Sequence, residues 1–344
     1  MADKTVMFSI CIPLYNGERY IAECIESALS QDFEDYEILI VNDGSTDRSI
    51  SIAEAYAKKN DKIRILTQEN KGIFHTRLRL FQEAKGQYIF SLDADDYLEP
   101  IALSTVAQSI FKNHSDIVLY NYFQLDDASG QRELQTPIFT AANYRGSDLM
   151  SVRELFLFTK KLNPVWVKVI RKDLLHPEDY LNYPKIGMWD DWILSLVPML
   201  SAESIEYIPA GLINYRVITS SMTGKFDITL FDTLKLIYSL KREYSDIIAN
   251  GDAPIVQYSE KCDLNYLTEV SKTIAYVPGK VYDRRGYKTL LHKIRDDAEF
   301  ASLYHAKGSE LAVVYRLPLI FLSHRFDILL LGMKQLSSFL RKKR

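Results

Sequence analysis

The chain has 344 residues, of which 47% are hydrophobic and 25% are charged, a composition typical of soluble globular proteins. Its net charge of −3 excludes the overall basic field expected of a nucleic-acid-binding protein. The charge is uneven, because residues 311–344 contain seven Lys or Arg and one acid, which gives them +6 and leaves −9 for the remainder.

Strand-like and helical patterns alternate over the first 125 residues. Apolar runs predict strands over residues 8–15, 36–43, 63–68, 86–93 and 116–125. Amphipathic segments predict helices over residues 17–31, 45–60, 74–84 and 100–113. Ser45 or Thr46 is the expected N-cap of the second helix, with Asp47 in its first turn. The alternation predicts an α/β fold with a mostly parallel sheet flanked by helices.

The regular alternation ends near residue 126. Ordered blocks return over residues 163–175, 187–200 and 210–224, and the chain beyond residue 226 has a mostly helical pattern rich in Tyr and Leu. We therefore expect one domain over residues 1–225 (halves 1–115 and 116–225), a helical extension over 226–310 and a basic amphipathic segment over 311–344.

Polar side chains gather where the predicted strands end. Tyr15 and Asn16 follow the first strand, Asp43 follows the second, and the sequence DADD, residues 93–96, follows the fourth. The carboxyl ends of parallel strands meet at one edge of an open sheet, where such folds bind ligands. Crowded carboxylates raise each other's pKa, so the acids of DADD require a positive partner, either a basic side chain or a metal ion.

The cysteines and the apolar runs indicate the cellular compartment in which the protein is expected. Cys11, Cys24 and Cys262 are an odd number without metal-site spacing, which indicates small core residues in a reducing cytoplasm. The first 20 residues contain only a strand-length apolar run, which does not resemble a signal peptide. No apolar run reaches the roughly 18 residues that a membrane-spanning helix needs.

Familiar nucleotide-binding motifs are missing. The first strand is followed by PLYNGERY, not by the glycine fingerprint of dinucleotide enzymes, and there is no Gly-Lys-Ser/Thr loop. This pattern disfavours a dinucleotide oxidoreductase. A nucleotidyltransferase would usually carry a Gly-rich loop with a basic residue at this position.

Several motifs in order resemble one family. SICIPLYNGERY through VNDGSTDRS, then ENKG…TR and GQYIFSLDADDYLEP, closely resemble the family 2 glycosyltransferases, which have the GT-A fold. The resemblance is dense over residues 8–100 and continues more loosely through VWVKVIRK, WDDW and YRVITSSMT to about residue 224. It implies a Rossmann-like GT-A domain that takes its sugar from a nucleotide-sugar donor, most often a UDP-sugar.

The resemblance also implies a donor site. Carried over residue by residue, the nucleotide-sugar-binding positions are Pro13, Tyr15, Asp43, Arg77, Asp93, Arg216 and Ser221. Pro13 and Tyr15 would flank the base, and Asp43 would hydrogen-bond the uracil. Asp95, with Asp93, would hold Mn²⁺ or Mg²⁺ at the diphosphate, a role that suits hard oxygen ligands. Taken alone, Asp43 and Asp96 also fit turn residues, and Tyr15 fits simple packing.

The family further carries an acidic pair that opens a helix and supplies the general base. Here the pair is Asp190-Asp191, so Asp191 is the expected base and Asp190 a helper, while Asp190 also fits a helix N-cap. Helix N–H groups favour the charged carboxylate, so we expect the pKa of Asp191 to stay low. Trp166 and Lys168 match the family's W-x-K and would border the acceptor, although Trp166 also fits a core position.

Two departures affect this alignment. Leu78 and Leu80 of TRLRL stand where the family usually has Asn and Gly, and Ile218 stands near a frequent His. The local geometry around Arg77 and the contacts to the diphosphate are therefore open at this point.

These features predict an inverting, metal-dependent glycosyltransferase of the hexosyltransferase type. Its acceptor would be a glycan or a lipid-linked oligosaccharide in polysaccharide biosynthesis. A nucleotidyltransferase and a non-catalytic nucleotide-sugar-binding protein remain alternatives.

The C-terminal segment suggests a location. Residues 311–344 combine apolar clusters with the basic end RKKR, a pattern typical of segments that lie in an anionic lipid surface. We expect a cytoplasmic protein that is peripheral on the inner face of the plasma membrane. A helix pair packed on the core, with a solvated basic end, is the alternative.

Overall fold

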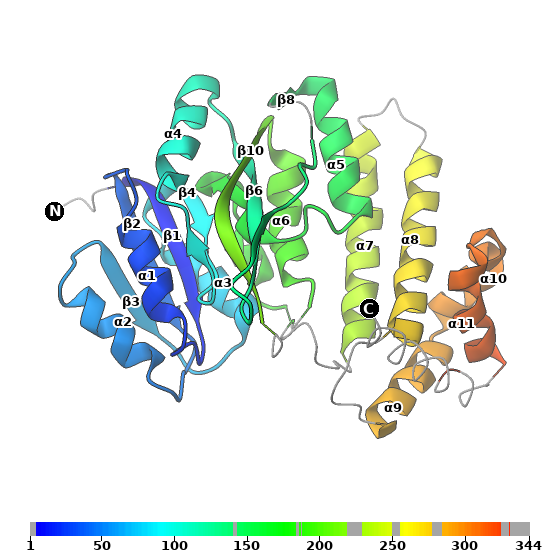
Figure 1. Ribbon diagram of the computed structural model, residues 1–344. Coiled ribbons are helices and arrows are strands. Elements are labelled where there is room, and N and C mark those ends of the chain that lie inside the picture. Colours follow the sequence, from blue (N-terminus) through cyan, green and yellow to red (C-terminus); the bar gives the residue numbers. More distant parts are fainter. Residues whose placement is uncertain are drawn as a thin grey trace. The chain divides into compact units, whose positions relative to one another are not determined.

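The computed structural model describes residues 5–139, 143–183, 186, 188–218, 229–249, 255–276, 284–324 and 330. The chain divides into two compact units, Met1–Thr219 and Ser220–Arg344 (Figure 1). The boundary predicted at residue 225 lies outside the described residues.

The N-terminal unit is built on a mixed sheet. Its described strands are β1 (Val6–Leu14), β2 (Tyr36–Asn42), β3 (Ile63–Thr67), β4 (Gly86–Ser91), β5 (Tyr97–Leu98), β6 (Ile117–Asp126), β7 (Arg132–Leu134), β8 (Asn143–Arg145), β9 (Lys168–Arg171) and β10 (Ser204–Val217). The order is β3-β2-β1-β4-β9-β6-β10-β5, with β7 beside β6 and β8 beside β10. The first four strands are parallel, as the sequence predicts, but β9 lies antiparallel between β4 and β6.

Helices cover this sheet on both faces. They are α1 (Ile21–Leu29), α2 (Ser49–Ala57), α3 (Ile73–Glu83), α4 (Ala102–Asn113), α5 (Leu149–Phe158) and α6 (Asp190–Ser201). Alternate residues of β1 point to one face, where Ile10 and Ile12 are fully buried and pack in one cluster with residues of α1, α2 and α4. Helix α3 contacts β1 and β2 but contributes nothing to that cluster, so it covers the other face.

The start of α2 differs from the prediction. The helix begins at Ser49, and neither Ser45 nor Thr46 is its N-cap. Instead, the backbone N–H of Asn16 donates to Ser45 Oγ (3.1 Å), and the backbone N–H of Thr46 donates to Asn16 Oδ1 (2.8 Å). These two bonds join the loops that follow β1 and β2. The N-cap prediction was wrong because the Ser45 hydroxyl accepts in this contact between loops, and Asp47, which precedes the helix and is not in its first turn, accepts from the backbone N–H of Ser49 (3.0 Å).

The described part of the C-terminal unit is helical, as the sequence predicts. It contains α7 (Leu230–Ala249), α8 (Ile255–Tyr276), α9 (Arg284–Arg295), α10 (Ala298–Lys307) and α11 (Val313–Ser323). The stacked rings of Tyr238 and Tyr266, 4.6 Å apart, join α7 to α8. Helix α11 packs on α8, where Ser271 Oγ donates to the carbonyl of Tyr315 (2.6 Å). None of the described helices is both long and apolar enough to cross a membrane.

All three cysteines are free thiols in the protein interior. Cys11 lies in β1, Cys24 in α1 and Cys262 in α8, and each is buried. Burial raises the pKa of all three thiols. They therefore act as small core residues, as expected from the sequence.

Candidate active site

The ends of β1, β2 and β4 meet at one edge of the sheet. The backbone N–H of Asp43 donates to the carbonyl of Leu14 (2.8 Å), which holds the end of β2 against the end of β1. On the other side of β1, the backbone N–H of Leu92 donates to the carbonyl of Cys11 (3.0 Å). The loops that carry Tyr15, Asp43 and DADD therefore start from neighbouring strands, as predicted.

Asp43 organises the turn between β3 and α3. Its carboxylate is 3% exposed and accepts hydrogen bonds from Gln68 Nε2 and from the backbone N–H groups of Lys71 and Gly72, each at 2.8 Å. Gly72 has φ +86, a left-handed conformation that suits glycine. Asp43 is thus a turn residue, and a contact with a base remains a prediction.

Tyr15 and Pro13 differ in exposure. Pro13 is buried within β1, where it pairs with Val41 of β2. The side chain of Tyr15, directly after the strand, is 52% exposed. This exposure disfavours the alternative of simple packing, and a contact of Tyr15 with a base stays a prediction.

Arg77 joins the acidic loop after β4 to the acidic pair that opens α6. Its Nη2 donates to Asp93 Oδ1 (2.7 Å), and its Nη1 donates to Asp191 Oδ1 (2.7 Å) and to Asp190. The guanidinium is buried, with the residue only 4% exposed. A basic side chain therefore supplies part of the positive charge that DADD requires.

Burial dominates the electrostatics of this cluster. It raises the pKa of Asp191 to about 7 and also raises the pKa of Asp190, although the charge of Arg77 lowers both. Burial would lower the pKa of Arg77, but the charges of Asp191, Asp93 and Asp190 raise it well above its usual value. The expectation of a low pKa for Asp191 was wrong, because the helix terminus does not compensate for desolvation.

Asp190 does not cap helix α6. The helix begins at Asp190 itself, and the preceding Trp189 has φ +70 without a capping side-chain bond. The carboxylate of Asp190 bonds Arg77 instead. The left-handed Trp189 turns the chain so that both acids of the first helical turn face the guanidinium of α3.

Arg216 of β10 holds the acidic loop from the other side. Its backbone N–H donates to Asp96 Oδ1 (2.7 Å) and its Nε to the carbonyl of Asp95 (2.9 Å). The rest of its guanidinium pairs with Asp127 (3.1 Å) and Glu23 (2.5 Å). Asp127, which also accepts from the hydroxyl of Tyr20 (2.9 Å), and Glu23 were missed from the sequence, because no local motif links them to Arg216. Ser221 lies outside the described residues.

The acidic loop suits a hard cation with additional ligands. Among the described residues, no three His, Cys, Asp or Glu side chains converge as a complete metal site. However, Asp96 Oδ2 is buried and has no hydrogen-bond partner in the part of the chain that the structure describes. Burial, and then the charge of Asp93, raises the pKa of Asp95 to about 6. A divalent ion that takes its other ligands from a bound molecule fits these carboxylates.

The W-x-K residues are both buried. Trp166 is 6% exposed and stacks on Tyr215, with ring centroids 4.8 Å apart, which agrees with the core alternative. Lys168 is 1% exposed, and its Nζ donates to the carbonyls of Pro164 (2.5 Å) and Asn163 (3.3 Å). Burial lowers the pKa of Lys168 to about 7, while the charge of Asp191 raises it. A border with the acceptor remains a prediction for both.

The α/β fold and the polar edge of its sheet are those expected of a glycosyltransferase of the GT-A type. Residues 9–168 match the family described as "Glycosyl transferase family 2". Residues 9–168 therefore form a glycosyltransferase family 2 domain, which makes up a little under half of the chain.

Known proteins agree with this assignment. The chain is 28% identical over 272 residues to a putative glycosyltransferase, EpsH, of Bacillus subtilis, covering 76% of this chain and 78% of EpsH. It is 26% identical over 302 residues to the glycosyltransferase GlyG of Streptococcus pneumoniae, covering 84% of this chain and 95% of GlyG. The fold is similar to that of residues 1–349 of S. aureus TarS in complex with UDP-GlcNAc (TM-score 0.66, 19% identity), covering 93% of this chain and 91% of that TarS fragment.

Proposed function

We propose that this glycosyltransferase moves a hexose from a UDP-sugar to a hydroxyl of a glycan or lipid-linked oligosaccharide, with inversion at the anomeric carbon. The observation that carries the proposal is the contact of Arg77 with both Asp93 and Asp191. One side chain thereby holds the acid proposed for the donor next to the acid proposed as base. The solved TarS complex with UDP-GlcNAc supports the donor class.

The donor residues have distinct proposed tasks. The exposed ring of Tyr15, with Pro13, flanks the base, and the oxygens of Asp43 accept from the uracil. Asp95 and Asp93 hold Mn²⁺ or Mg²⁺, which when bound supplies Lewis-acid stabilisation of the departing diphosphate. Arg216 and Ser221 complete the diphosphate side, Arg216 by fixing the backbone of Asp95.

Asp191 is the proposed general base. A group removes a proton efficiently when its pKa lies near the working pH, and a value of about 7 meets this condition. Asp191 would take the proton of the acceptor hydroxyl as the oxygen attacks the anomeric carbon, on the face opposite the diphosphate. Asp190, bonded to the same guanidinium, keeps Arg77 and therefore Asp191 in place. Trp166 and Lys168, which are both buried, would support the acceptor side of the site.

One experiment tests donor, metal and mechanism together. UDP release should be measured across a panel of UDP-sugars with Mn²⁺ or Mg²⁺, or with EDTA, and the linkage formed should be assigned by NMR. We expect turnover with one donor, loss of turnover in EDTA, and an inverted anomeric configuration. Retention would contradict the single displacement. Release of pyrophosphate would favour a nucleotidyltransferase, and binding without turnover a non-catalytic protein.

The base is tested by a matched pair of variants. Asp191→Asn keeps the shape but removes the basicity, and loss of a general base costs roughly 10²–10⁴ in rate. Asp190→Asn should be milder, and both should bind UDP nearly as the wild type does. Nearly full activity of Asp191→Asn would refute its role.

We also propose that the protein works as a peripheral protein on the inner face of the plasma membrane. The charge of +6 on residues 311–344 supports attraction to anionic lipids.

A further inference from the structure

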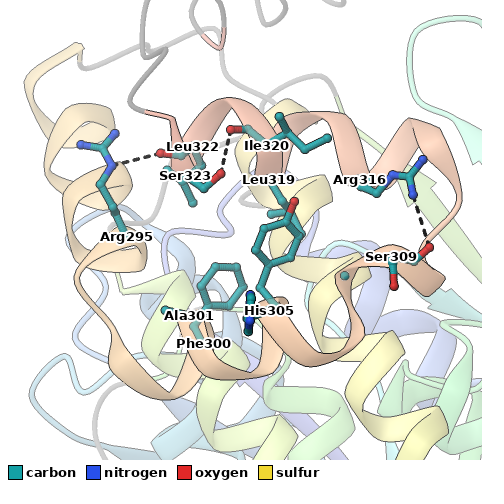
Figure 2. A pocket seen from close by; sticks show the side chains of 12 residues that line it. Arg295, Phe300, Ala301, His305, Ser309, Arg316, Leu319, Ile320, Leu322 and Ser323 are labelled. Carbon is teal, nitrogen blue, oxygen red and sulfur yellow. Dashed lines mark hydrogen bonds between the residues drawn. The ribbon is translucent and has the colours of Figure 1, made fainter.

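A groove of about 600 Å³ lies within the C-terminal unit, outside the proposed active site. It runs between α10 and α11 and reaches the end of α9 (Figure 2). Its volume lies within the range of ligand pockets, and no proposed step of sugar transfer uses it.

The walls of the groove are largely apolar. Phe300 and Tyr304 of α10 carry nearly parallel rings with centroids 6.4 Å apart. Leu319 of α11 faces α10 across the groove (Figure 2), and Ile320 also lines it. Phe300 and Leu319 are buried, while Tyr304 and Ile320, which also line the groove, are partly exposed. Such a surface suits a hydrocarbon chain.

Arg316 places a positive charge at the rim. Its Nη1 donates to the carbonyl of Ser309 (3.3 Å), and no acid among the described residues forms an ion pair with it. Nearby Lys307, in contrast, pairs with Glu260 and Glu310. The guanidinium therefore has charge and donors available for an anion from outside.

The outer face of α11 is also apolar. Val313, Val314 and Leu317 are 65%, 53% and 39% exposed, and their spacing places them on one side of the helix. The opposite side carries Leu319 and Leu322, which are buried. An exposed apolar stripe beside a cation that forms no ion pair with a described acid has the pattern of an interfacial helix.

We propose that α11 and the groove between α10 and α11 form a docking surface for an anionic phospholipid bilayer. Val313, Val314 and Leu317 insert among the lipids, Arg316 binds a headgroup phosphate, and the groove receives one acyl chain. Charge complementarity favours this occupant, because residues 311–344 contain seven basic residues and one acid. This surface rests on the membrane association proposed above and gives it a structural basis. Its test measures no sugar transfer, so failure of the docking surface can be distinguished from failure of the proposed transferase activity.

Vesicle cosedimentation of the full chain tests the docking surface. The wild type should sediment with vesicles of phosphatidylglycerol and phosphatidylcholine in equal parts, and much less with phosphatidylcholine alone or at high salt. The combined variant Val313→Ser, Val314→Ser and Leu317→Ser should bind roughly tenfold less. Arg316→Gln should weaken binding to the anionic vesicles specifically.

The matched control is Phe111→Ser, whose side chain is also 65% exposed but lies on α4 of the N-terminal unit. It should sediment as the wild type does. Thermal unfolding should stay near the wild-type value for all variants, because the changed residues contact solvent. Unchanged sedimentation of both the triple variant and Arg316→Gln would overturn the proposal, as would equal binding to neutral vesicles.

A second measurement addresses the groove itself. The three tryptophans, Trp166, Trp189 and Trp192, all lie in the N-terminal unit, so Tyr304→Trp adds a reporter to the groove. Lipids brominated on the acyl chain should quench this variant more strongly than the wild type. Equal quenching of the two proteins would overturn the acyl-chain assignment.

Discussion

Arg77 is the residue on which the site depends most. Its guanidinium contacts Asp93, Asp190 and Asp191 through fixed, divergent donors. An ammonium group keeps the charge but not this geometry. We expect Arg77→Lys to fold and its kcat to be lowered by about 10²-fold. The acidic limb of its pH–rate profile should move to higher pH, because Asp191 loses the partner that lowers its pKa. Arg79→Lys, on the same helix, is the control. A profile unchanged from that of the wild type would contradict the role of Arg77.

The pH dependence of stability should report Asp191 and Lys168 with opposite signs. Asp191 has a pKa of about 7 in the folded state, above its unfolded value, so its contribution favours folding at low pH and is lost as pH rises to about 7. Burial lowers the pKa of Lys168 to about 7 in the folded state. Above pH 7 the unfolded state therefore binds more protons than the folded state, and stability rises with pH in that range. The difference in unfolding free energy between wild type and Asp191→Asn should change below pH 7, and that for Lys168→Met above it. Chemical denaturation across pH checks both, and flat difference curves would contradict the two shifts.

Asp95 should carry the metal dependence of donor binding. Its carboxylate follows a buried strand end, and its backbone is held by Arg216. Asp95→Ala should weaken UDP binding with Mn²⁺ by about tenfold or more, because one ionic ligand is lost, and should leave unfolding nearly unchanged. Calorimetry with and without EDTA measures this. Equal UDP affinity of wild type and Asp95→Ala under both conditions would argue against the metal assignment.

The types of the site residues were predictable, but their partners were not. Strand ends followed by polar residues indicated Tyr15, Asp43 and DADD, because that pattern is local. Arg77 bonds Asp93, which lies 16 positions further along the chain, and Asp191, which lies 114 positions further. No sequence periodicity encodes contacts over such separations. Burial also depends on the assembled fold, so the raised pKa of Asp191 could not be foreseen.

At the level of the elements, close packing of β1 and β4 positions the acidic loop. A Cβ on Gly86 would lie 2.3 Å from the backbone nitrogen of Ser9, so only glycine fits between these strands. Gly86→Ala should cost roughly 3 kcal/mol or more in unfolding free energy, because rigid backbone must move. Gly130→Ala is the control, since no described atom beyond the two neighbouring residues would lie within 4 Å of its added Cβ. Only the φ of +70 at Gly130 opposes the change, at about 1 kcal/mol. Denaturant unfolding that ranks the two variants in the opposite order would contradict this account.

The parallel half of the sheet and the mixed half differ in how well the sequence predicts them. Strands β1 to β4 alternate with helices, and this local alternation of sequence patterns predicted the four strands and the helices between them. Strand β9 inserts between β4 and β6, which precede it by many residues, and pairs antiparallel with both. Long-range pairing of this kind leaves no periodic mark on the sequence.

At the scale of the whole molecule, the two units should separate donor binding from lipid binding. Every described residue proposed for the donor, from Pro13 to Arg216, belongs to the N-terminal unit, and the lipid surface belongs to the C-terminal unit. A chain ending at Gly224 should keep UDP binding within about threefold, because the sheet and its loops carry their own core. It should no longer sediment with anionic vesicles. Loss of UDP binding by a folded fragment would show that the C-terminal unit contributes to the donor site.

The buried cysteines make the protein suitable for fluorescence labelling. Maleimide dyes react with accessible thiolates, and Cys11, Cys24 and Cys262 are buried with raised pKa values. Phe111→Cys and Val313→Cys would then add one reactive position to each unit without removing any native residue of the core. A dye pair at these positions would follow the distance between the two units in solution by resonance energy transfer, before and after UDP is added.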